Sequence, residues 1–280
     1  HGIYLNSAAF NNTIYDNNIT TNNMTSSYGV YLENNVNNNT FFRNKITSLS
    51  AGIVVNGTGQ TASQTTRFNT FTNDTIIPCS VGCAANYQDV ILTANATDLT
   101  FTNVSFNKSR VALIPRSPDT PIEINNLTVR WFLSVNITNS TNNLGIANAQ
   151  ANINDSFANN LFNLTADASG ATSVVEVTEY TQNGTVNFTT DLDTCTDVRS
   201  NVNITCFSPY NISVNITGYN PNSASIDVNR SKFVNISMTL TPDTTAPIVN
   251  TSFNVSSPVV NDVINFSGNI TDGELHHVRH

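Results

Sequence analysis

A ten-residue stretch occurs twice near the start of the chain, as "NNTIYDNNIT" (11–20) and "NNTFFRNKIT" (38–47). Extending the alignment in both directions gives four copies of a longer unit. Each copy begins with a short apolar segment ("GIYL", "GVYL", "GIVV" or "DVIL") and continues to a threonine-led segment. Those threonines are Thr13, Thr40, Thr70 and Thr100, so the units are 27, 30 and 30 residues long. A period in this range predicts a stacked repeat architecture.

Four positions of the unit are apolar in every copy. Two belong to the first segment, where they alternate with outward positions as a strand requires. The other two belong to the second segment and are five residues apart, an odd spacing that one flat strand cannot place on a single face. The chain must therefore turn a corner between them. The sixteen residues are Ile3, Val30, Ile53, Val90; Leu5, Leu32, Val55, Leu92; Ile14, Phe41, Phe71, Phe101; and Ile19, Ile46, Ile76, Phe106.

Asparagine fills two further columns of the repeat. One lies in or near the corner, where asparagine tolerates left-handed backbone and bonds its own main chain; it comprises Asn17, Asn44, Asn73 and Asn103. The other comprises Asn12, Asn39 and Asn69, and we expect their amides to stack by hydrogen bonds. Leu99 stands at that place in the fourth copy, so this stack should end there.

Short strands, corners and like residues in register predict an all-β fold, with a right-handed parallel β-helix of about four coils over residues 1–127. A leucine-rich horseshoe is the competitor, but its leucine spacing and helical half are missing. The two quoted stretches resemble the repeats of NosD-type proteins and of sugar-binding or sugar-hydrolysing β-helices in prokaryotic, especially archaeal, surface proteins. The copper-related role of NosD does not carry over, because the chain has two methionines and its four histidines lie at positions 1, 276, 277 and 280.

Residues 128–240 lack the repeat and read as alternating strands separated by turn signals. The spacing predicts a small antiparallel β-sandwich, with a loop or hairpin over 182–208. The segments "TADASG" (165–170) and "GY" (218–219) are similar to turns of carboxypeptidase-regulatory-like (prealbumin-type) modules. That resemblance implies a spacer without a catalytic centre. The strands are expected at 128–138, 149–155, 160–170, 172–181, 210–219, 223–228 and 232–240.

Residues 241–280 resemble a linker followed by the opening of an immunoglobulin-like surface repeat, with two strands and too few to close a sandwich. The chain also begins at His1, without an initiator methionine and inside a repeat. We therefore expect a fragment of a longer protein, truncated at both ends.

Composition restricts the partners. Only 11% of residues are charged and the net charge is −8, which argues against nucleic acid and anionic membranes. The chain contains 47 Asn and 38 Thr, yet 39% of residues are apolar and regularly spaced, which argues against disorder. No apolar run approaches the roughly 18–20 residues of a membrane-spanning helix.

The four cysteines form two local pairs. Cys79 and Cys83 lie in "PCSVGC", and Cys195 and Cys206 bracket a ten-residue loop. An even count with local pairing predicts two disulfides in an exported protein. Free thiols and a metal site are the alternatives, although neither pair has a nearby histidine or further cysteine to complete four ligands.

The sequence contains 25 Asn-X-Ser/Thr sequons. Exposed strands alone generate this pattern, because residues i and i+2 share one face. Glycosylation of some sites is nevertheless expected, and Asn139 and Asn183 are the candidates placed on exposed turns.

No catalytic, cofactor-binding or metal-binding residues are predicted. The pairs Asp191/Asp193 and Asp272/Glu274 could in principle serve a glycosidase, but solvated acids are the better interpretation. Along the repeat, Asp16, Glu33, Asp74, Asp89 and Asp98 occupy different columns.

The prediction is a non-enzymatic, secreted or cell-surface modular protein without a cofactor: a stalk, adhesin or S-layer-like component that contacts cell-envelope components or surface glycans. The alternative is a fragment of a glycan-processing or glycan-binding β-helix whose active groups lie in missing coils. A cluster of acids, arginines or aromatics on one outer face of those coils would favour the alternative.

Overall fold

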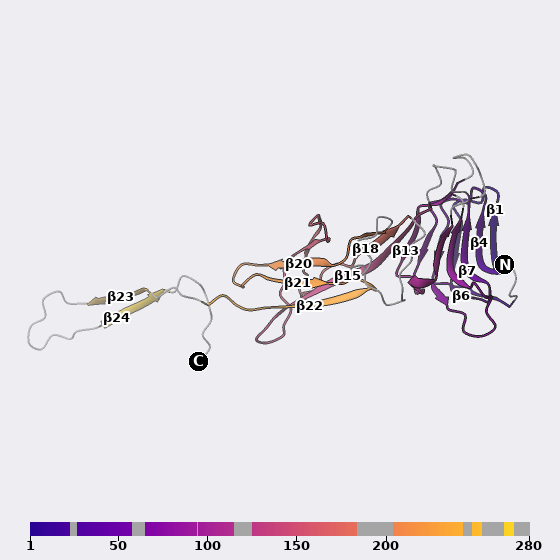
Figure 1. Ribbon diagram of the computed structural model, residues 1–280. Helices are drawn as coiled ribbons and strands as arrows, with labels where there is room; N and C mark the ends of the chain where they lie inside the picture. The colour runs from indigo at the N-terminus through magenta and orange to yellow at the C-terminus, as the bar shows by residue number, and fades with distance from the viewer. Residues whose placement is uncertain are drawn as a thin grey trace, which may run out of the picture. The chain divides into compact units, whose positions relative to one another are not determined.

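The computed structural model describes residues 1–22, 27–57, 65–93, 95–114, 125–183, 204–242, 248–253 and 266–271. Nearly all regular structure in these ranges is β-strand (Figure 1). The chain divides into two compact units, His1–Thr239 and Leu240–His280. Each unit is described by itself.

The first unit begins with stacked parallel sheets, here called the ladder. One has five strands in the order β1-β4-β7-β11-β14, and all its neighbouring strands run parallel. Each chain repeat therefore adds one rung to the sheet. The strands are β1 (Ile3–Asn6), β4 (Tyr28–Glu33), β7 (Ala51–Asn56), β11 (Gln88–Thr93) and β14 (Val111–Ile114).

The second half of each repeat builds two further parallel sheets. One runs β2-β5-β9-β13-β15 and the other β3-β6-β10. A short pair, β8 (Thr66–Arg67) with β12 (Ala96–Thr97), completes the ladder. The strands are β2 (Thr13–Tyr15), β5 (Thr40–Phe42), β9 (Thr70–Thr72), β13 (Leu99–Thr102), β15 (Leu127–Asn139), β3 (Asn18–Thr21), β6 (Lys45–Ser48) and β10 (Thr75–Ile77).

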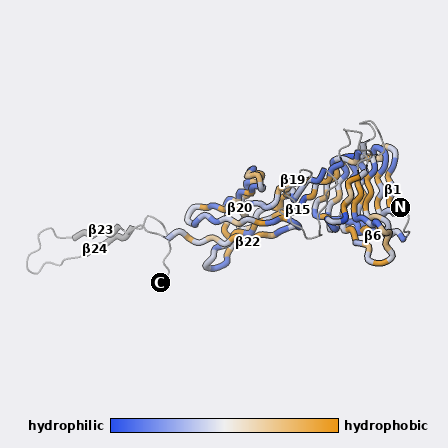
Figure 2. The backbone as a smooth tube through the Cα atoms, viewed as in Figure 1, coloured by the Kyte–Doolittle hydropathy of each residue, from blue (hydrophilic) through white to orange (hydrophobic). Residues whose placement is uncertain are grey.

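The register of these strands matches the predicted apolar columns. Phe41 pairs with Phe71, and Phe71 with Phe101, and all three side chains are fully buried. The rings of Phe41 and Phe71 stack with centroids 4.3 Å apart, and Phe101 meets Phe71 edge-on at 5.3 Å. Figure 2 shows apolar residues concentrated in the stacked strands around β1. The predicted pairing of like residues is confirmed.

A glycine opens the first segment of three repeats because the interior has no room for a side chain there. A Cβ on Gly29 would lie 2.3 Å from a methyl of Ile46 and 2.6 Å from the carbonyl oxygen of Gly52. Gly2 and Gly52 are equally crowded. The isoleucine of one sheet thus packs against bare backbone of the next.

The predicted asparagine stack is present. The Nδ2 of Asn12 donates to Oδ1 of Asn39 (2.8 Å), and the Nδ2 of Asn39 donates to Oδ1 of Asn69 (3.0 Å). Asn39 and Asn69 are fully buried, and Leu99 takes the next place in the interior. Each oxygen also accepts from the backbone N–H of the preceding rung, so the buried amides are satisfied.

A second polar stack lies at the corner, and it corrects one prediction. Asn17 donates to Asn44 (3.0 Å), and Asn44 donates to Asp74 (2.9 Å), with Val104 buried at the following place. Asn17 and Asn44 therefore form a hydrogen-bonded column and do not provide the left-handed corner. The left-handed residues precede this column by one position and are Asp16, Arg43, Asn73 and Asn103.

The ladder has five rungs in its two largest sheets, one more than the four predicted. Val111 pairs with Val90 in β11, and Val129 pairs with Phe101 in β13. The sequence comparison missed this copy because Arg110 stands where the other copies have glycine or aspartate. Its spacing from Arg110 to Thr128, eighteen residues, equals that of the third copy.

Strand β15 belongs to both parts of the first unit. Its 13 residues alternate between buried and half-buried, and its first four continue the ladder from β13. The same strand pairs antiparallel with β18 (Val175–Gln182) and parallel with β22 (Lys232–Met238). The sheet therefore crosses the expected boundary at residue 127, and it differs from the predicted antiparallel arrangement in the parallel pair β15–β22.

A second sheet after the ladder is wholly antiparallel, in the order β17-β16-β20-β21. Its buried side chains share one core with those of β15 and β18; Tyr210 is fully buried and donates to the carbonyl of Thr178 (2.7 Å). The strands are β16 (Gln150–Asn154), β17 (Asn160–Thr165), β20 (Tyr210–Asn215) and β21 (Asn222–Ile226), with β19 (Ile204–Cys206) beside β18. This second sheet, together with β15, β18, β19 and β22, is called the sandwich.

The "TADASG" turn joins β17 to the segment before β18. The Oδ1 of Asp167 accepts from the N–H groups of Ser169 (2.8 Å) and Ala171 (3.0 Å), and Gly170 takes a positive φ of 84°. Those hydrogen bonds, together with the Ser169 hydroxyl, hold the pKa of Asp167 below its usual range. The sequence signature thus corresponds to a capped turn.

The second unit contains one antiparallel pair, β23 (Ile248–Phe253) with β24 (Phe266–Thr271). Ile248 pairs with Thr271 and Phe253 with Phe266. Two strands were predicted here.

Candidate functional site

A cleft of about 450 Å³ lies where the ladder meets the sandwich. Residues of both parts line it. Asp74 follows β9, Asn103 follows β13, and Trp131 lies within β15. Lys108 comes from the short 3₁₀ helix η2 (Lys108–Arg110), and Arg230 from the connection between β21 and β22. This mixture of charged, amide and aromatic groups makes the cleft a candidate functional site.

Asp74 forms the ladder side of the cleft and is almost fully buried. Its Oδ1 accepts from the backbone N–H (2.5 Å) and the Nδ2 (2.9 Å) of Asn44, and its Oδ2 accepts from the N–H of Thr72 (3.1 Å). Burial nevertheless raises its pKa to about 6, because these donors do not fully offset the lost hydration. Asp74 therefore changes charge in the mildly acidic range while held in the polar stack.

Lys108, which lines the cleft, belongs to a buried ion pair. The Nζ of Lys108 lies 2.5 Å from Oε1 of Glu179, and their side chains are 5% and 0% exposed. The indole N–H of Trp131 donates to the other oxygen, Oε2, at 2.6 Å. Burial raises the pKa of Glu179, while Lys108 opposes that shift. Both carboxylate oxygens thus have partners inside the protein.

This ion pair joins residues that the chain keeps far apart. Lys108 and Glu179 are 71 positions apart in the sequence. The 3₁₀ turn that carries Lys108 is capped by Asn107, whose Oδ1 accepts from the N–H of Ser109 (2.9 Å). The N–H of Asn107 itself donates to Asp89 (2.7 Å). The turn therefore presents a lysine from the ladder to the central sheet of the sandwich.

The boundary between the ladder and the sandwich, with Lys108, Asn103, Trp131, Glu179 and Ser231, is called the junction. Asn103 makes a second link across it. Its Nδ2 donates to Oδ1 of Asn73 on the preceding rung (2.6 Å), and its Oδ1 accepts from the hydroxyl of Ser231 (2.8 Å). Ser231 in turn accepts from the N–H of Phe132 (3.0 Å). Arg230, next in the chain, is solvent-exposed at the rim of the cleft.

One carboxyl group, Asp74, lines the cleft, and a second, Glu179, contacts the lining residues Lys108 and Trp131. Asp74 terminates a polar stack, and Glu179 balances Lys108 and accepts from Trp131. General acid–base catalysis requires a carboxyl group within hydrogen-bond reach of a substrate. Here the oxygens bond to side-chain and backbone donors of the protein itself, so the arrangement stabilises the junction.

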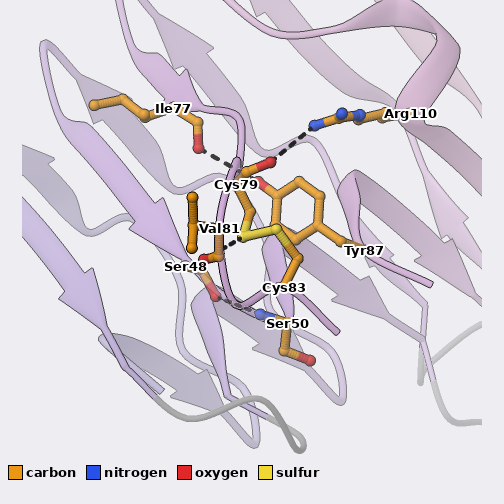
Figure 3. The surroundings of a disulfide bond; sticks show 8 residues. All are labelled: Ser48, Ser50, Ile77, Cys79, Val81, Cys83, Tyr87 and Arg110. Atoms are coloured by element: carbon orange, nitrogen blue, oxygen red, sulfur yellow. Dashed lines mark hydrogen bonds between the residues drawn. A yellow bond between two sulfur atoms is a disulfide. The ribbon is translucent and has the colours of Figure 1, made fainter. Parts of the chain in front are cut away.

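The predicted disulfide Cys79–Cys83 is present, in the connection between β10 and β11, with Cα atoms 5.8 Å apart (Figure 3). The Tyr87 hydroxyl donates to the carbonyl of Ile77 (3.4 Å), and Arg110 donates to the carbonyl of Cys79 (3.5 Å). The guanidinium also lies 5.6 Å from the centre of the Tyr87 ring. The disulfide loop is thus anchored on both sides.

Cys206 is buried and disulfide-bonded. Its predicted partner, Cys195, lies outside the described residues. Among the residues that the structure describes, no cysteine is free.

The two glycosylation candidates differ in exposure. Asn183 follows β18 and is exposed, as predicted. Asn139 is the last residue of β15 and only 8% exposed; its Oδ1 accepts from the N–H of Thr141, and its Nδ2 donates to the hydroxyl of Tyr219. The expectation that Asn139 lies on an exposed turn is wrong, because its side chain caps the following turn.

The other acids of the repeat have separate partners. Asp16 pairs with Arg43 on the surface (2.6 Å), Glu33 accepts from two tyrosines, and Asp98 accepts from Thr97 (3.1 Å). The described part of the chain contains no group of three or more His, Cys, Asp or Glu that could hold a metal ion. The pairs Asp191/Asp193 and Asp272/Glu274 lie outside the described residues.

Of the junction residues, one had a usable sequence signal. Glu179 occupies an inward position of "VEVTEYTQ" (175–182), in phase with the buried Val177. A lone acid on the apolar face of a strand indicates a buried partner. Lys108 had no comparable signal, because it lies in a short polar segment.

No protein-family model matches the chain, and no curated protein matches its sequence. Within the described ranges, no helix is long and apolar enough to span a membrane.

Proposed function

We propose that this chain is a non-enzymatic, modular protein of the cell surface, acting as a stalk, adhesin or surface-layer component. The ladder is interpreted as a right-handed parallel β-helix of the NosD-type repeat class. It is followed by a carboxypeptidase-regulatory-like spacer and the start of an immunoglobulin-like repeat. The partners are cell-envelope components or surface glycans.

The observation that carries the proposal is the construction of the junction. A single strand, β15, is the last rung of the ladder and the central strand of the sandwich. The Lys108–Glu179 pair and the Asn103–Ser231 hydrogen bond cross the same boundary. A continuous sheet with buried polar links resists bending between modules, as a stalk requires.

Two further features support an extracellular setting. The Cys79–Cys83 disulfide and the bonded Cys206 fit an oxidising compartment. Only 11% of the chain is charged and it is rich in Asn and Thr, a composition suited to contact with sugars and neighbouring surface proteins.

The absence of a glycan-processing active site within this chain is tested directly by turnover. The full chain is incubated with a panel of plant, algal and microbial polysaccharides, and new reducing ends and unsaturated products are measured. We expect none. Turnover that Asp74→Asn or Glu179→Gln abolishes, with Glu176→Gln as an exposed control on the same strand, would contradict the proposal.

The location is tested on intact source cells. Added protease should cleave the protein without lysis, whereas protection until lysis would place it inside the cell and end the surface interpretation.

A further inference from the structure

An aromatic cluster lies on the outer face of the ladder sheet that begins with β1 and β4. Tyr4 in β1 and Tyr31 in β4 are paired residues of neighbouring rungs, with rings 5.3 Å apart and nearly parallel, at 10°. Tyr28, at the start of β4, meets Tyr31 edge-on at 5.3 Å. Tyr4 remains 46% exposed. We call Tyr4, Tyr28 and Tyr31 the tyrosine platform.

Two of the three phenol groups of the platform are fixed by one carboxylate. Tyr4 donates to Oε2 of Glu33 (2.6 Å), and Tyr31 donates to Oε1 (2.8 Å). Partial burial raises the pKa of Tyr31 to about 12, so its hydroxyl stays protonated. Rings held in this way lose little freedom when a ligand stacks on them, which lowers the entropic cost of binding.

A row of polar side chains continues from the platform across the sheet. Asn56 in β7 donates to the Tyr31 hydroxyl (3.1 Å), and Thr93 in β11 donates to Oδ1 of Asn56 (2.8 Å). Glu33, Asn56 and Thr93 therefore lie on three successive rungs beside the rings. The face combines aromatic carbon with carboxylate, amide and hydroxyl groups.

The platform already holds one flat ring from the chain itself. The imidazole of His1 stacks on Tyr28 with centroids 5.1 Å apart and planes at 17°. It also lies 4.8 Å from Tyr31 and 5.4 Å from Tyr4. The tyrosine faces thus accept a ring at stacking distance.

We propose that the tyrosine platform binds the sugar rings of a neutral glycan, in place of His1. The C–H face of a pyranose is apolar and slightly positive, which complements the negative face of an aromatic ring. Its hydroxyls can bond to Glu33, Asn56 and Thr93. An apolar protein segment could stack on the rings, but it would remove these three half-buried polar groups from water without offering them a hydrogen bond.

This inference rests on the proposed surface role and names the partner class for it. It differs from the junction cleft in exposure, because Asp74 and Glu179 are buried whereas Tyr4 is 46% exposed. It also supplies what the sequence alone did not reveal: aromatic residues and an acid gathered on one outer face of the ladder.

The test is affinity electrophoresis of the full chain in gels containing a neutral glucan, mannan or galactan, with chitosan as a cationic probe. At least one neutral polysaccharide should retard the wild-type protein. Tyr31→Ala and Tyr4→Ala should each weaken that binding by about tenfold or more, as expected for central aromatic contacts. Tyr4→Phe keeps the ring and should cost less. His1→Ala frees the platform and should strengthen binding.

Tyr15→Ala is the matched control. Tyr15 is 59% exposed, but it lies on β2 in another sheet. Binding should be unchanged in this variant, and melting curves establish that all variants are folded.

Three results would overturn the inference: no retardation by any neutral polysaccharide, equal weakening by Tyr15→Ala, or retardation by chitosan alone, which would indicate a cation site. None of them would affect the proposed stalk role, which is decided by turnover and by surface exposure. Conversely, turnover lost in Asp74→Asn would end that role and leave the platform binding to stand.

Discussion

The ladder and the junction bury polar groups in opposite ways. In the ladder, neutral amides repeat at one position and bond to each other from rung to rung, as Asn12, Asn39 and Asn69 do. At the junction, a single ion pair, Lys108–Glu179, is enclosed with one indole N–H. A repeated amide needs only the next copy of itself, whereas the ion pair needs three segments brought together by the whole fold.

The contrast predicts different sensitivities. Neutral stacks should tolerate changes of pH, and the loss of one rung should affect its neighbours. An enclosed charge pair should depend on both partners, because either charge alone is costly to bury. Asp74, an acid at the end of an amide stack, lies between these two cases.

The largest effect is expected from breaking the ion pair. Glu179→Gln leaves Lys108 buried without its counter-charge and should lower the free energy of unfolding by about 3–5 kcal/mol. Denaturant unfolding measures it. The double variant Lys108→Met/Glu179→Gln should recover most of the loss.

The control lies on the same strand. Glu176 pairs with Arg130 at 3.8 Å on the surface, and Glu176→Gln should cost no more than about 1 kcal/mol. Equal losses for the two single variants would contradict the junction described here.

Phe71→Ala tests the ladder itself. Phe71 is fully buried between Phe41 and Phe101, so emptying the site should cost about 3–5 kcal/mol. Hydrogen exchange should show lost protection on β5 and β13, and through β13 on the start of β15. Ile212→Ala in the sandwich is the comparison, and its loss should concentrate on β16, β20 and β21. The same exchange pattern for both variants would mean that the ladder does not behave as stacked rungs.

Asp74→Asn should stabilise the protein at neutral pH. Its pKa is raised to about 6 in the fold from 3.8, so the folded state binds the proton more tightly than the unfolded state. Stability from this group is therefore gained as the pH falls from about 7 to 4, and is absent at higher pH. At pH 7 the amide should add up to about 3 kcal/mol, since one pKa unit corresponds to about 1.4 kcal/mol, less the hydrogen bond from the N–H of Thr72 that an amide nitrogen cannot accept.

Thermal unfolding of wild type and Asp74→Asn across this range provides the measurement. The two curves should converge near pH 4. A difference that does not change with pH would show that the carboxyl group is not the cause.

The smallest effect is expected at the surface pair Arg43–Asp16, whose side chains are 54% and 48% exposed. Arg43 holds the pKa of Asp16 below its usual range, so any stability from the pair is lost as the pH falls through that lowered value. Arg43→Ala should shift the melting temperature least of these variants, and the shift should vanish in high salt. A salt-independent shift would point instead to the left-handed backbone of Arg43.

Much of the ladder could be predicted from the sequence because the same apolar and asparagine positions recur in each copy of the repeat. A parallel stack places the same position of successive copies side by side, so a column such as Phe41, Phe71 and Phe101 is visible as a recurring letter. The asparagine stack followed for the same reason. The fifth rung was not predicted, because Arg110 stands where the other units begin with glycine or aspartate.

Only the tertiary structure shows which residues meet at the junction and in the tyrosine platform. Lys108, Trp131 and Glu179 come from three elements without a common period, so no local pattern could bring them together. The role of β15 was hidden because alternation shows that a strand has two faces, and does not show which strands lie on its edges. The tyrosine platform was missed because outward positions carry no burial pattern. The sequence determined the inward columns by burial and repetition, and the fold decided which polar and aromatic groups met elsewhere.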